Sequence, residues 1–409
     1  MPNPGPAVAA VPVRFEFVAL VALLISLVAL STDIMLPGLP QIGDALGVTD
    51  PNGAQLIVTV FMAGLSVGQL FSGPLSDAYG RKMVVYGGLV VFLAGCILSI
   101  ASWSLESMLV GRFLQGLGAA APRIVMVAII RDQYAGRAMA RVLSFAMVVF
   151  ILVPAVAPAL GQAIMLATGW RMMFAFLLAT AIVGFIWFAF RQPETLAPDR
   201  RLPFSAEQIW SGIRQTCGDR MALGYTLAAG TVFGAFVGYL SSAQQIFADA
   251  FGEVDRFPLY FAVLALAIGS ASLTNSALVM RFGMRRLSHT ALIVVTIASC
   301  AFVPITFGWF GPTGLGAFMA WGMVAFFCFG ILFGNFNALA MEPLGHIAGI
   351  GAAVVGSLTT FLALASGLLI GQLFDGTTRP LIIGFAVLGL AGLVIVAVTE
   401  RGRLFQATE

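Results

Sequence analysis

Long apolar segments alternate with short polar ones along almost the whole chain. A helix that crosses a bilayer needs about 20 predominantly apolar residues, and on that basis the pattern predicts twelve spans. They lie at residues 15–36, 53–73, 83–102, 106–130, 139–166, 170–190, 221–244, 257–280, 287–307, 315–340, 350–372 and 381–399. The predicted fold class is therefore an all-α membrane protein with twelve transmembrane helices.

Composition agrees with this pattern and excludes several classes of protein. The chain is 60% hydrophobic and 10% charged, with a mean hydropathy of +0.99, whereas a soluble chain carries about 25% charge. A soluble enzyme is excluded. The single lysine, Lys82, is not part of a Gly-Lys phosphate loop, which argues against an ATP-driven pump. The four cysteines and two histidines show no metal-ligand spacing, so we expect no metal, no cofactor and no nucleic-acid partner.

The basic residues predict the orientation of the chain in the membrane. With the N-terminus inside, 16 of the 21 Lys and Arg residues fall in cytoplasmic segments. The outer side holds only Arg171, Arg256 and Arg379, and Arg112 and Arg123 lie inside a span. This asymmetry places both termini in the cytoplasm by the positive-inside rule. The first apolar segment has no convincing cleavage site, so we interpret it as the first span.

The longest hydrophilic stretch, residues 191–220, divides the spans into six and six. Within it, Ser205 and Gln208 form a capping-box pattern ahead of apolar residues, which predicts a short amphipathic helix on the inner membrane surface. An unstructured linker is the alternative. The predicted organisation is a disordered N-terminus at 1–14, six-helix bundles at 15–190 and 221–400, the linker at 191–220 and a cytoplasmic tail at 401–409.

A weak internal repeat supports the division into two halves. The segment GPLSDAYGRK at 73–82 follows the second span, and SALVMRFGMR at 276–285 follows the eighth. Similarity between two six-helix halves is typical of transporters that work by alternating access.

The segment 73–82 combines a helix stop, a tight turn, an acid and two bases. Gly80 suits a turn position with positive φ, and Asp77 can pair with Arg81 across one helix turn. Such a cluster can join two helix ends and release them, although a simple topology signal is the alternative. It resembles the signature loop of the major facilitator superfamily. The predicted cytoplasmic latch comprises Gly73, Asp77, Gly80, Arg81, Lys82 and Arg131.

Two further motifs carry the same resemblance. The run from Leu109 to Ala120 is similar to the motif of the superfamily's fourth helix, and the resemblance implies that Arg112 takes part in proton transfer. Residues 154–161 resemble the Gly-Pro motif of antiporters in the fifth helix, but Ala157 stands where the motif has Gly. An ordinary kinked helix is the alternative. The residues of this predicted antiporter motif are Pro154, Pro158 and Gly161.

The end of the first span resembles one particular branch of this superfamily. Asp33 is followed by Leu-Pro-Gly-Leu-Pro, which resembles the drug:proton antiporter branch with twelve spans and, in particular, the Bcr/CflA group of multidrug exporters. The Glu342-Pro343 pair before the eleventh span resembles the same group. The resemblance implies export of small, largely apolar drugs of the bicyclomycin, chloramphenicol and sulfonamide type.

Asp33 and Arg112 are charged residues at membrane depth, which is costly and rarely without a task. Counted at ~1.5 Å per residue, Asp33 lies ~6 Å and Arg112 ~9 Å from the same outer end. We expect them at matching depth on antiparallel helices, with Asp33 as the titrating group and Arg112 biasing its pKa. The alternative is an interfacial Asp33 in water.

Arg123 follows Arg112 by eleven residues, so both lie on one helix face, ~16 Å apart along the axis. It can contact an anionic or polar part of a substrate, or extend to the inner surface. The second half carries no acid or arginine away from the ends of its spans, so proton handling is assigned to the first half. The predicted substrate cavity contains Arg123, Gln115, Met126, Phe236, Tyr239, Asn335 and Phe336.

Together these features predict a monomeric efflux antiporter in the bacterial inner membrane, in which protons enter as a drug-like molecule leaves. A proton-coupled or facilitative transporter of an endogenous metabolite is the alternative. A non-transporting receptor or scaffold on the same fold has less support, because its buried charges would have no use.

Overall fold

The structure is a computed structural model that describes residues 14–50, 52–309 and 311–405. In this part of the chain twelve helices of 19 residues or more follow one another. The first half contains α1 (Phe15–Asp33), the short α2 (Leu39–Ala45), α3 (Leu56–Tyr79), α4 (Arg81–Ile100), α5 (Leu105–Gln133), α6 (Gly136–Thr168) and α7 (Arg171–Arg191). The short α8 (Ala206–Gly218) is followed by α9 (Arg220–Gln245), α10 (Phe257–Phe282), α11 (Met284–Thr306), α12 (Leu315–Met341), α13 (Ala348–Gln372) and α14 (Arg379–Thr399).

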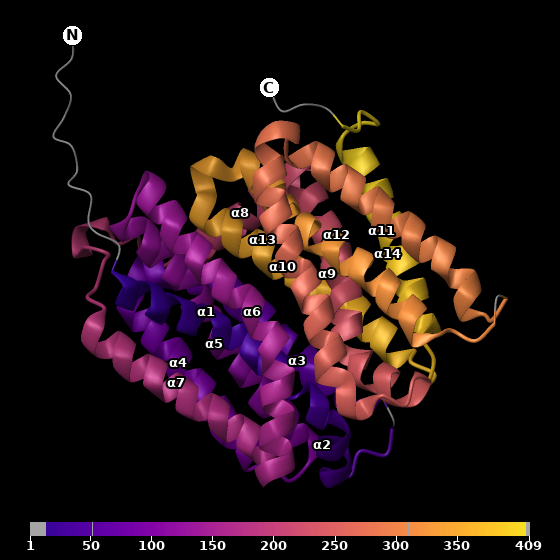
Figure 1. Cartoon of the computed structure of the whole chain (residues 1–409). Helices are drawn as coiled ribbons and strands as arrows, with labels where there is room; N and C mark the ends of the chain where they lie inside the picture. Colours follow the sequence, from indigo (N-terminus) through magenta and orange to yellow (C-terminus); the bar gives the residue numbers. More distant parts are fainter. Residues whose placement is uncertain (1–13, 51, 310, 406–409) are drawn as a thin grey trace.

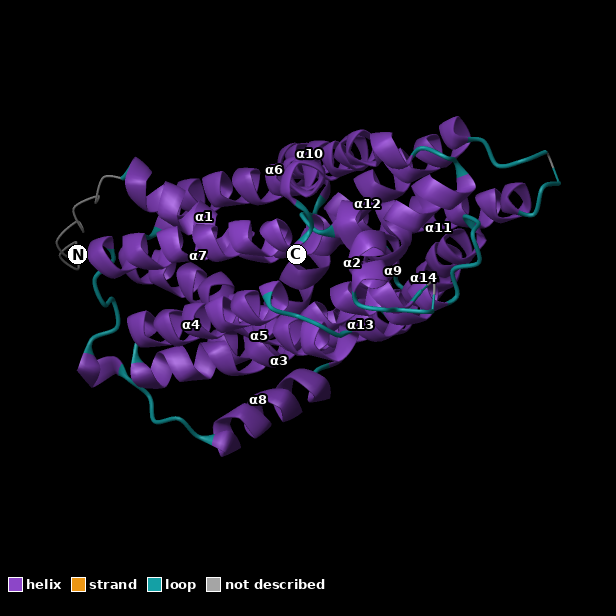
Figure 2. Ribbon diagram, turned by 90° about the horizontal axis from the view of Figure 1, so that it is seen from below, coloured by secondary structure: helices purple, strands orange, loops and turns teal. Residues whose placement is uncertain are grey.

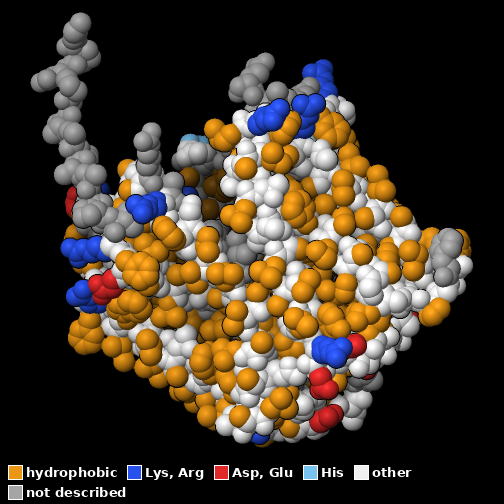
Figure 3. Space-filling view, in the orientation of Figure 1, with side chains coloured by type: hydrophobic (Ala, Val, Ile, Leu, Met, Phe, Trp, Pro, Cys, Tyr) orange, Lys and Arg blue, Asp and Glu red, His pale blue; other side chains and the backbone are white. Residues whose placement is uncertain are grey.

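Length and apolar composition make the described helices suitable for crossing a membrane. Ten runs meet both conditions, and the longest of them, Leu315–Gln372, contains two helices, α12 and α13. In α6 the described apolar stretch is Leu152–Thr168. Figure 3 shows apolar side chains over the broad middle of the visible face, while basic and acidic side chains gather toward its two ends. This distribution is that of a multi-pass membrane protein.

The helices form two bundles, α1–α7 and α9–α14, which lie side by side with both chain ends at the same end of the molecule (Figure 1). The bundles meet along two seams, α3 with α13 and α6 with α10 (Figure 2). Helix α8 connects them and packs on α13, where Gly212 faces Ile350. The Ser205 hydroxyl caps α8 by accepting the N–H of Gln208 at 3.4 Å.

The first span differs from the sequence-based prediction at its C-terminal end. The α-helix ends at Asp33, a 3-10 turn follows at Leu36–Gly38, and α2 then continues to Ala45. The apolar pattern predicts a single span that ends at residue 36, just before Pro37. Pro37 and Pro40 instead occupy early positions of the next helical segments, where a missing N–H costs little. Asp33 therefore lies at a break within a longer helical run.

The predicted helix stop at Gly73-Pro74 is wrong. Helix α3 continues through Pro74 to Tyr79, and α4 begins at Arg81. Only Gly80 separates the two helices, with a φ of 99° that disfavours residues with a side chain. The sequence pattern predicts a loop of ten residues, whereas in the structure Gly80 alone forms the turn.

Candidate functional site: the transport pathway and its gates

Arg112 is fully buried in α5, in the middle of the first half. Its Nε donates to the carbonyl oxygen of Ile57 at 3.0 Å, Nη2 donates to that of Ser31 at 3.0 Å, and Nη1 donates to the Gln115 amide oxygen. The guanidinium also lies 4.6 Å from the centroid of the Phe61 ring. The cation is thus held by neutral acceptors and a ring face from three directions.

Asp33 is 3% exposed at the C-terminal end of α1. Among the described residues, none donates a hydrogen bond to its carboxylate or forms an ion pair with it, and Arg112 is no exception. The carboxylate is close enough to the Tyr239 side chain of α9 to interact with it electrostatically. Arg112 therefore binds the backbone of the helix that carries Asp33 and not the acid itself.

The proline-containing helix α6 holds this segment from the other side. Pro154 and Pro158 both lie inside α6. One turn later, Gly161 packs so closely that a Cβ there would overlap the backbone oxygen of Ile34. The contact places the fifth-span motif directly against the helix break that follows Asp33.

The other predicted cavity residues of α5 lie in different surroundings. Gln115 is fully buried, and its amide group donates to the Ser99 hydroxyl of α4 at 3.3 Å, so it belongs to the Arg112 network. Met126 is also fully buried. Arg123 is half-buried, with no hydrogen-bond or ion-pair partner among the described residues. Of the three, Arg123 alone offers an unused polar group.

In the second half, stacked aromatic rings connect α9 and α12. The Phe236 and Phe329 rings stack with centroids 4.5 Å apart, and Phe233 and Phe333 extend the cluster. Phe233, Phe236 and Phe333 are half-buried. Phe329 and Phe333 were missed by sequence reasoning, although their spacing of four residues places them on one helix face.

The remaining predicted cavity residues of the second half are buried within it. Tyr239 stacks on Phe261 at 5.7 Å, and its hydroxyl has no hydrogen-bond partner among the described residues. Phe336 packs against Tyr225 at 5.5 Å. Asn335 exchanges two amide hydrogen bonds of 2.9 Å with Asn275 of α10. Phe336 and Asn335 therefore contribute to packing between helices of one bundle in this conformation.

The segment around Gly80 forms a compact polar cluster. Arg81 pairs with Asp77 of the preceding turn, with Asp132 of α5 at 3.0 Å, and with the Ser76 hydroxyl at 2.9 Å. The Asp77 carboxylate also lies beside Gly349 at the N-terminal end of α13, where a Cβ would be 3.5 Å from it. The cluster thus joins three helices of the first half and reaches the second.

Three other members of the predicted latch are placed differently. Gly73 lies against Gly349 of α13, and Lys82 donates its Nζ to the carbonyl of Ala189 at 2.9 Å. Arg131 is exposed on α5, and it is the neighbouring Asp132 that binds Arg81.

The linker contributes Glu194, which sequence reasoning missed. Its carboxylate accepts backbone N–H groups from Arg81 and Lys82 at the N-terminus of α4, at 3.1 and 3.0 Å, and from Thr195 and Leu196. Partial burial would raise the pKa of Glu194, but the four N–H donors outweigh it and hold that pKa below its usual value. The linker is thereby attached to the turn at Gly80.

At the opposite end of the molecule, amide side chains join the two bundles. Asn52 donates its Nδ2 to the carbonyls of Gln372 at 3.2 Å and Phe374 at 3.0 Å, and Gln372 returns a bond of 3.0 Å to the Asn52 carbonyl. Gln55 donates to Gln245 of α9 at 2.6 Å. These contacts close the space between the halves at the end near Asp33, and no motif in the sequence predicts them.

A second network missing from the predictions lies at the other end of the second half. The Tyr225 hydroxyl donates to Glu400 and contacts His289 Nε2 at 3.2 Å. Arg285 forms ion pairs of 3.2 Å with Glu400 and with Glu342. Charged residues at the ends of different spans therefore converge on one half-buried cluster, because α9 and α11 begin there and α14 ends there.

Two pseudo-symmetric six-helix bundles, unpaired polar groups at their interface and polar contacts at both ends define a secondary transporter. The chain belongs to the major facilitator superfamily, whose family model matches residues 21–363. It is 28% identical to a bicyclomycin resistance protein homolog of Haemophilus influenzae, over 90% of this chain and 92% of that one. It is 29% identical to the transporter YdgK of Bacillus subtilis, over 88% and 89%. Other relatives are named multidrug resistance protein MdtL, in Klebsiella pneumoniae, and chloramphenicol resistance protein, in Pseudomonas aeruginosa.

A solved structure supports the fold independently. The human organic anion transporter MFSD10 superposes with a TM-score of 0.68 over 93% of this chain and 99% of that one, at 18% identity. At this identity the likeness establishes the fold of two six-helix halves and leaves the substrate open.

Proposed function

We propose that this protein is a proton-coupled antiporter of a bacterial inner membrane, with both termini in the cytoplasm. It exports small, largely apolar drug-like compounds of the chloramphenicol, bicyclomycin or sulfonamide type. The proposal rests on the burial of the Asp33 carboxylate. Among the described residues, none donates a hydrogen bond to this buried carboxylate or forms an ion pair with it. Such a group is costly as an anion, so sealing it from water favours proton uptake and opening it to water favours release.

The surroundings of Asp33 support coupling to alternating access. The acid lies at a helix break, where Gly161 of α6 packs on the backbone of the next residue, Ile34, and it interacts electrostatically with Tyr239 of α9. Any motion of one bundle against the other changes what faces it. Arg112 fixes the preceding turn through Ser31 and so positions Asp33 without neutralising it.

The unpaired groups of both halves suit a drug with one polar part. Arg123 supplies a cation without a partner in the first half, and the Phe233–Phe236 stack supplies apolar ring faces in the second. A molecule with an aromatic body and a nitro, carboxylate or sulfonyl group matches both features. The resistance names of the relatives support the same class of substrate.

The test is uphill transport in proteoliposomes with an imposed pH gradient. Asp33→Asn keeps the shape of the side chain, but the amide cannot take up or release a proton. We therefore expect this variant to bind chloramphenicol and to lose gradient-driven accumulation. Asp44→Asn is a matched control, since this acid is exposed on α2 eleven residues later. Full gradient-driven transport by the Asp33 variant would contradict the proposal. Proton release from everted vesicles on adding substrate separates antiport from uptake of a metabolite.

Arg123 is tested separately, on substrates that differ in charge. Arg123→Ala should weaken transport of an anionic compound more than that of a neutral one, and Arg123→Lys should restore part of it. Equal behaviour of both variants and the parent chain on all substrates would remove Arg123 from the site.

A further inference from the structure

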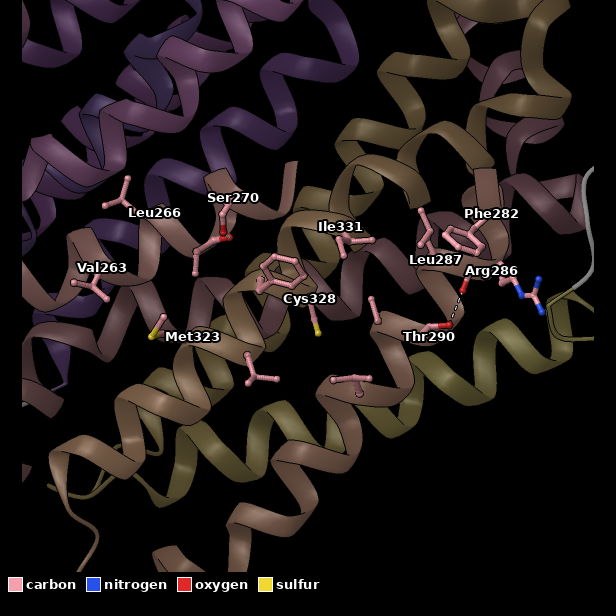
Figure 4. A pocket seen from close by; sticks show the side chains of 15 residues that line it. Val263, Leu266, Ser270, Phe282, Arg286, Leu287, Thr290, Met323, Cys328 and Ile331 are labelled. Atoms are coloured by element: carbon pink, nitrogen blue, oxygen red, sulfur yellow. Dashed lines mark hydrogen bonds between the residues drawn. The ribbon is translucent and has the colours of Figure 1, made fainter. Parts of the chain in front are cut away.

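A groove of about 890 Å³ lies on the second half between α10, α11 and α12. Figure 4 shows its length: Val263, Leu266 and Met323 line one end, and Leu287 and Arg286 lie toward the other. Almost every lining side chain is apolar. The groove is distinct from the transport site, which lies between the bundles.

The groove opens to the outer surface of the bundle. Leu266 is 53% exposed and Met323 is 49% exposed, and Val294 on α11 is similarly accessible. In a membrane-spanning region, surface of this kind is covered by acyl chains. A long groove in such a surface fits an acyl chain that lies along the helices.

One end of the groove carries an available cation. Arg286 is exposed and is the single charged residue among those that line the groove. The adjacent Arg285 is already bound by Glu342 and Glu400. Arg281 stacks on Phe282 at 5.2 Å and adds positive charge near the same end. In Figure 4 the Arg286 guanidinium extends beyond the apolar lining, where a headgroup would lie above its chains.

We propose that this groove binds an anionic phospholipid, with an acyl chain along α10–α12 and its phosphate on Arg286. Basic residues at the mouth of a groove between transmembrane helices are the recognised pattern for such headgroups. A guanidinium suits a phosphate because it presents paired N–H donors. The inference goes beyond the proposed function, because it depends on neither the substrate nor the direction of transport.

Native mass spectrometry of the full chain tests the proposal, by titrating phosphatidylglycerol against phosphatidylcholine with the same acyl chains. We expect one phosphatidylglycerol to be retained in preference, and Arg286→Gln to weaken that binding roughly tenfold. Arg220→Gln is the matched control, an exposed arginine at the same end that lies outside the groove. It should bind lipid like the parent chain.

A second variant tests the groove itself. Thr290 is exposed and lies one turn from Arg286, so Thr290→Trp should obstruct the headgroup end without disturbing the core. We expect it to lose the retained lipid while its melting temperature stays unchanged. Equal binding of both lipids, an equal effect of Arg286→Gln and Arg220→Gln, displacement of the lipid by chloramphenicol, or protection of the groove in a dimer would each overturn the proposal. Asp33→Asn should still bind lipid, so this failure and that of the transport proposal are distinguishable.

Discussion

Arg112 donates a hydrogen bond to the backbone oxygen of Ser31, two residues before Asp33, and the Asp33 carboxylate has no hydrogen-bond or ion-pair partner in the described part of the chain. A cation near an acid would ordinarily hold that acid in its charged form. Here the cation is satisfied by backbone and amide oxygens, and the acid is kept apart. The pair therefore acts through position: Arg112 fixes the helix turn, and Asp33 stays free to exchange a proton.

This arrangement predicts that Arg112 cannot be replaced by lysine. An ammonium group cannot reach the Ser31, Ile57 and Gln115 oxygens together, because they surround a planar fork. We expect Arg112→Lys to lower stability by about 1–3 kcal/mol and to abolish gradient-driven transport. Thermal unfolding in detergent and proteoliposome flux measure the two effects.

Arg171 provides the control for that substitution. It also donates to two backbone oxygens, those of Ile100 and Ser102 at 3.1 and 3.0 Å, but at an exposed helix end. Arg171→Lys should cost less than about 1 kcal/mol and leave transport intact. If Arg112→Lys behaved in the same way, the guanidinium geometry would be irrelevant to function.

Gly161 predicts a second effect on the same segment. A Cβ at this position would displace the backbone of Ile34, next to Asp33, and overpacking of this kind costs about 1–3 kcal/mol. Gly161→Ala should therefore lower both stability and transport. Gly87→Ala is the matched control, because a Cβ on that helical glycine of α4 meets open space. A fully active Gly161→Ala variant would show that α6 can shift away from Ile34 at little cost.

Glu194 predicts a pH dependence of stability. Its pKa in the folded protein is lowered from 4.5, so its contribution is complete above pH 4.5 and is lost as the pH falls through the folded value. Glu194→Gln should cost about 0.5–1 kcal/mol at neutral pH, and the difference from the parent chain should shrink below pH 4.5. Unfolding curves between pH 6 and 3.5 measure it. A difference that stayed constant down to pH 3.5 would exclude a role for the carboxylate charge.

The sequence predicted most of the architecture, because spans, basic asymmetry and the loop at 73–82 are regular patterns. Helix rise also placed Arg112 level with the end of α1, where the structure has it bonded to Ser31. The sequence could not show whether Arg112 binds the Ser31 carbonyl or the Asp33 carboxylate. The two groups lie only two residues apart, and the direction of the side chains decides between them. Glu194, Asn52 and Gln372 are single polar residues in loops and at span ends. They acquire partners only when distant segments pack, so no local pattern identifies them.

The amide contacts between Asn52 and Gln372 predict how the outer end opens. They join α13 to the turn before α3, so breaking them should favour the conformation with that end open. Asn52→Ala removes its two donated bonds, and we expect a shift of about 1–2 kcal/mol, a factor of roughly 5–30 in the ratio of closed to open molecules. Electron-resonance distances between spin labels at the outer ends of α3 and α13 measure this ratio.

Asn275→Ala is the control for that experiment. Asn275 also makes two amide hydrogen bonds, but with Asn335 inside one bundle, so its loss should leave the distance distribution unchanged. A shift with Asn275→Ala equal to that with Asn52→Ala would mean that the labels report general loosening. A specific shift with Asn52→Ala, and a similar one with Gln372→Ala, would identify these amides as the outer gate. Because no charged group takes part in these contacts, any change of the ratio with pH should come from Asp33 and should be absent in the Asp33→Asn variant.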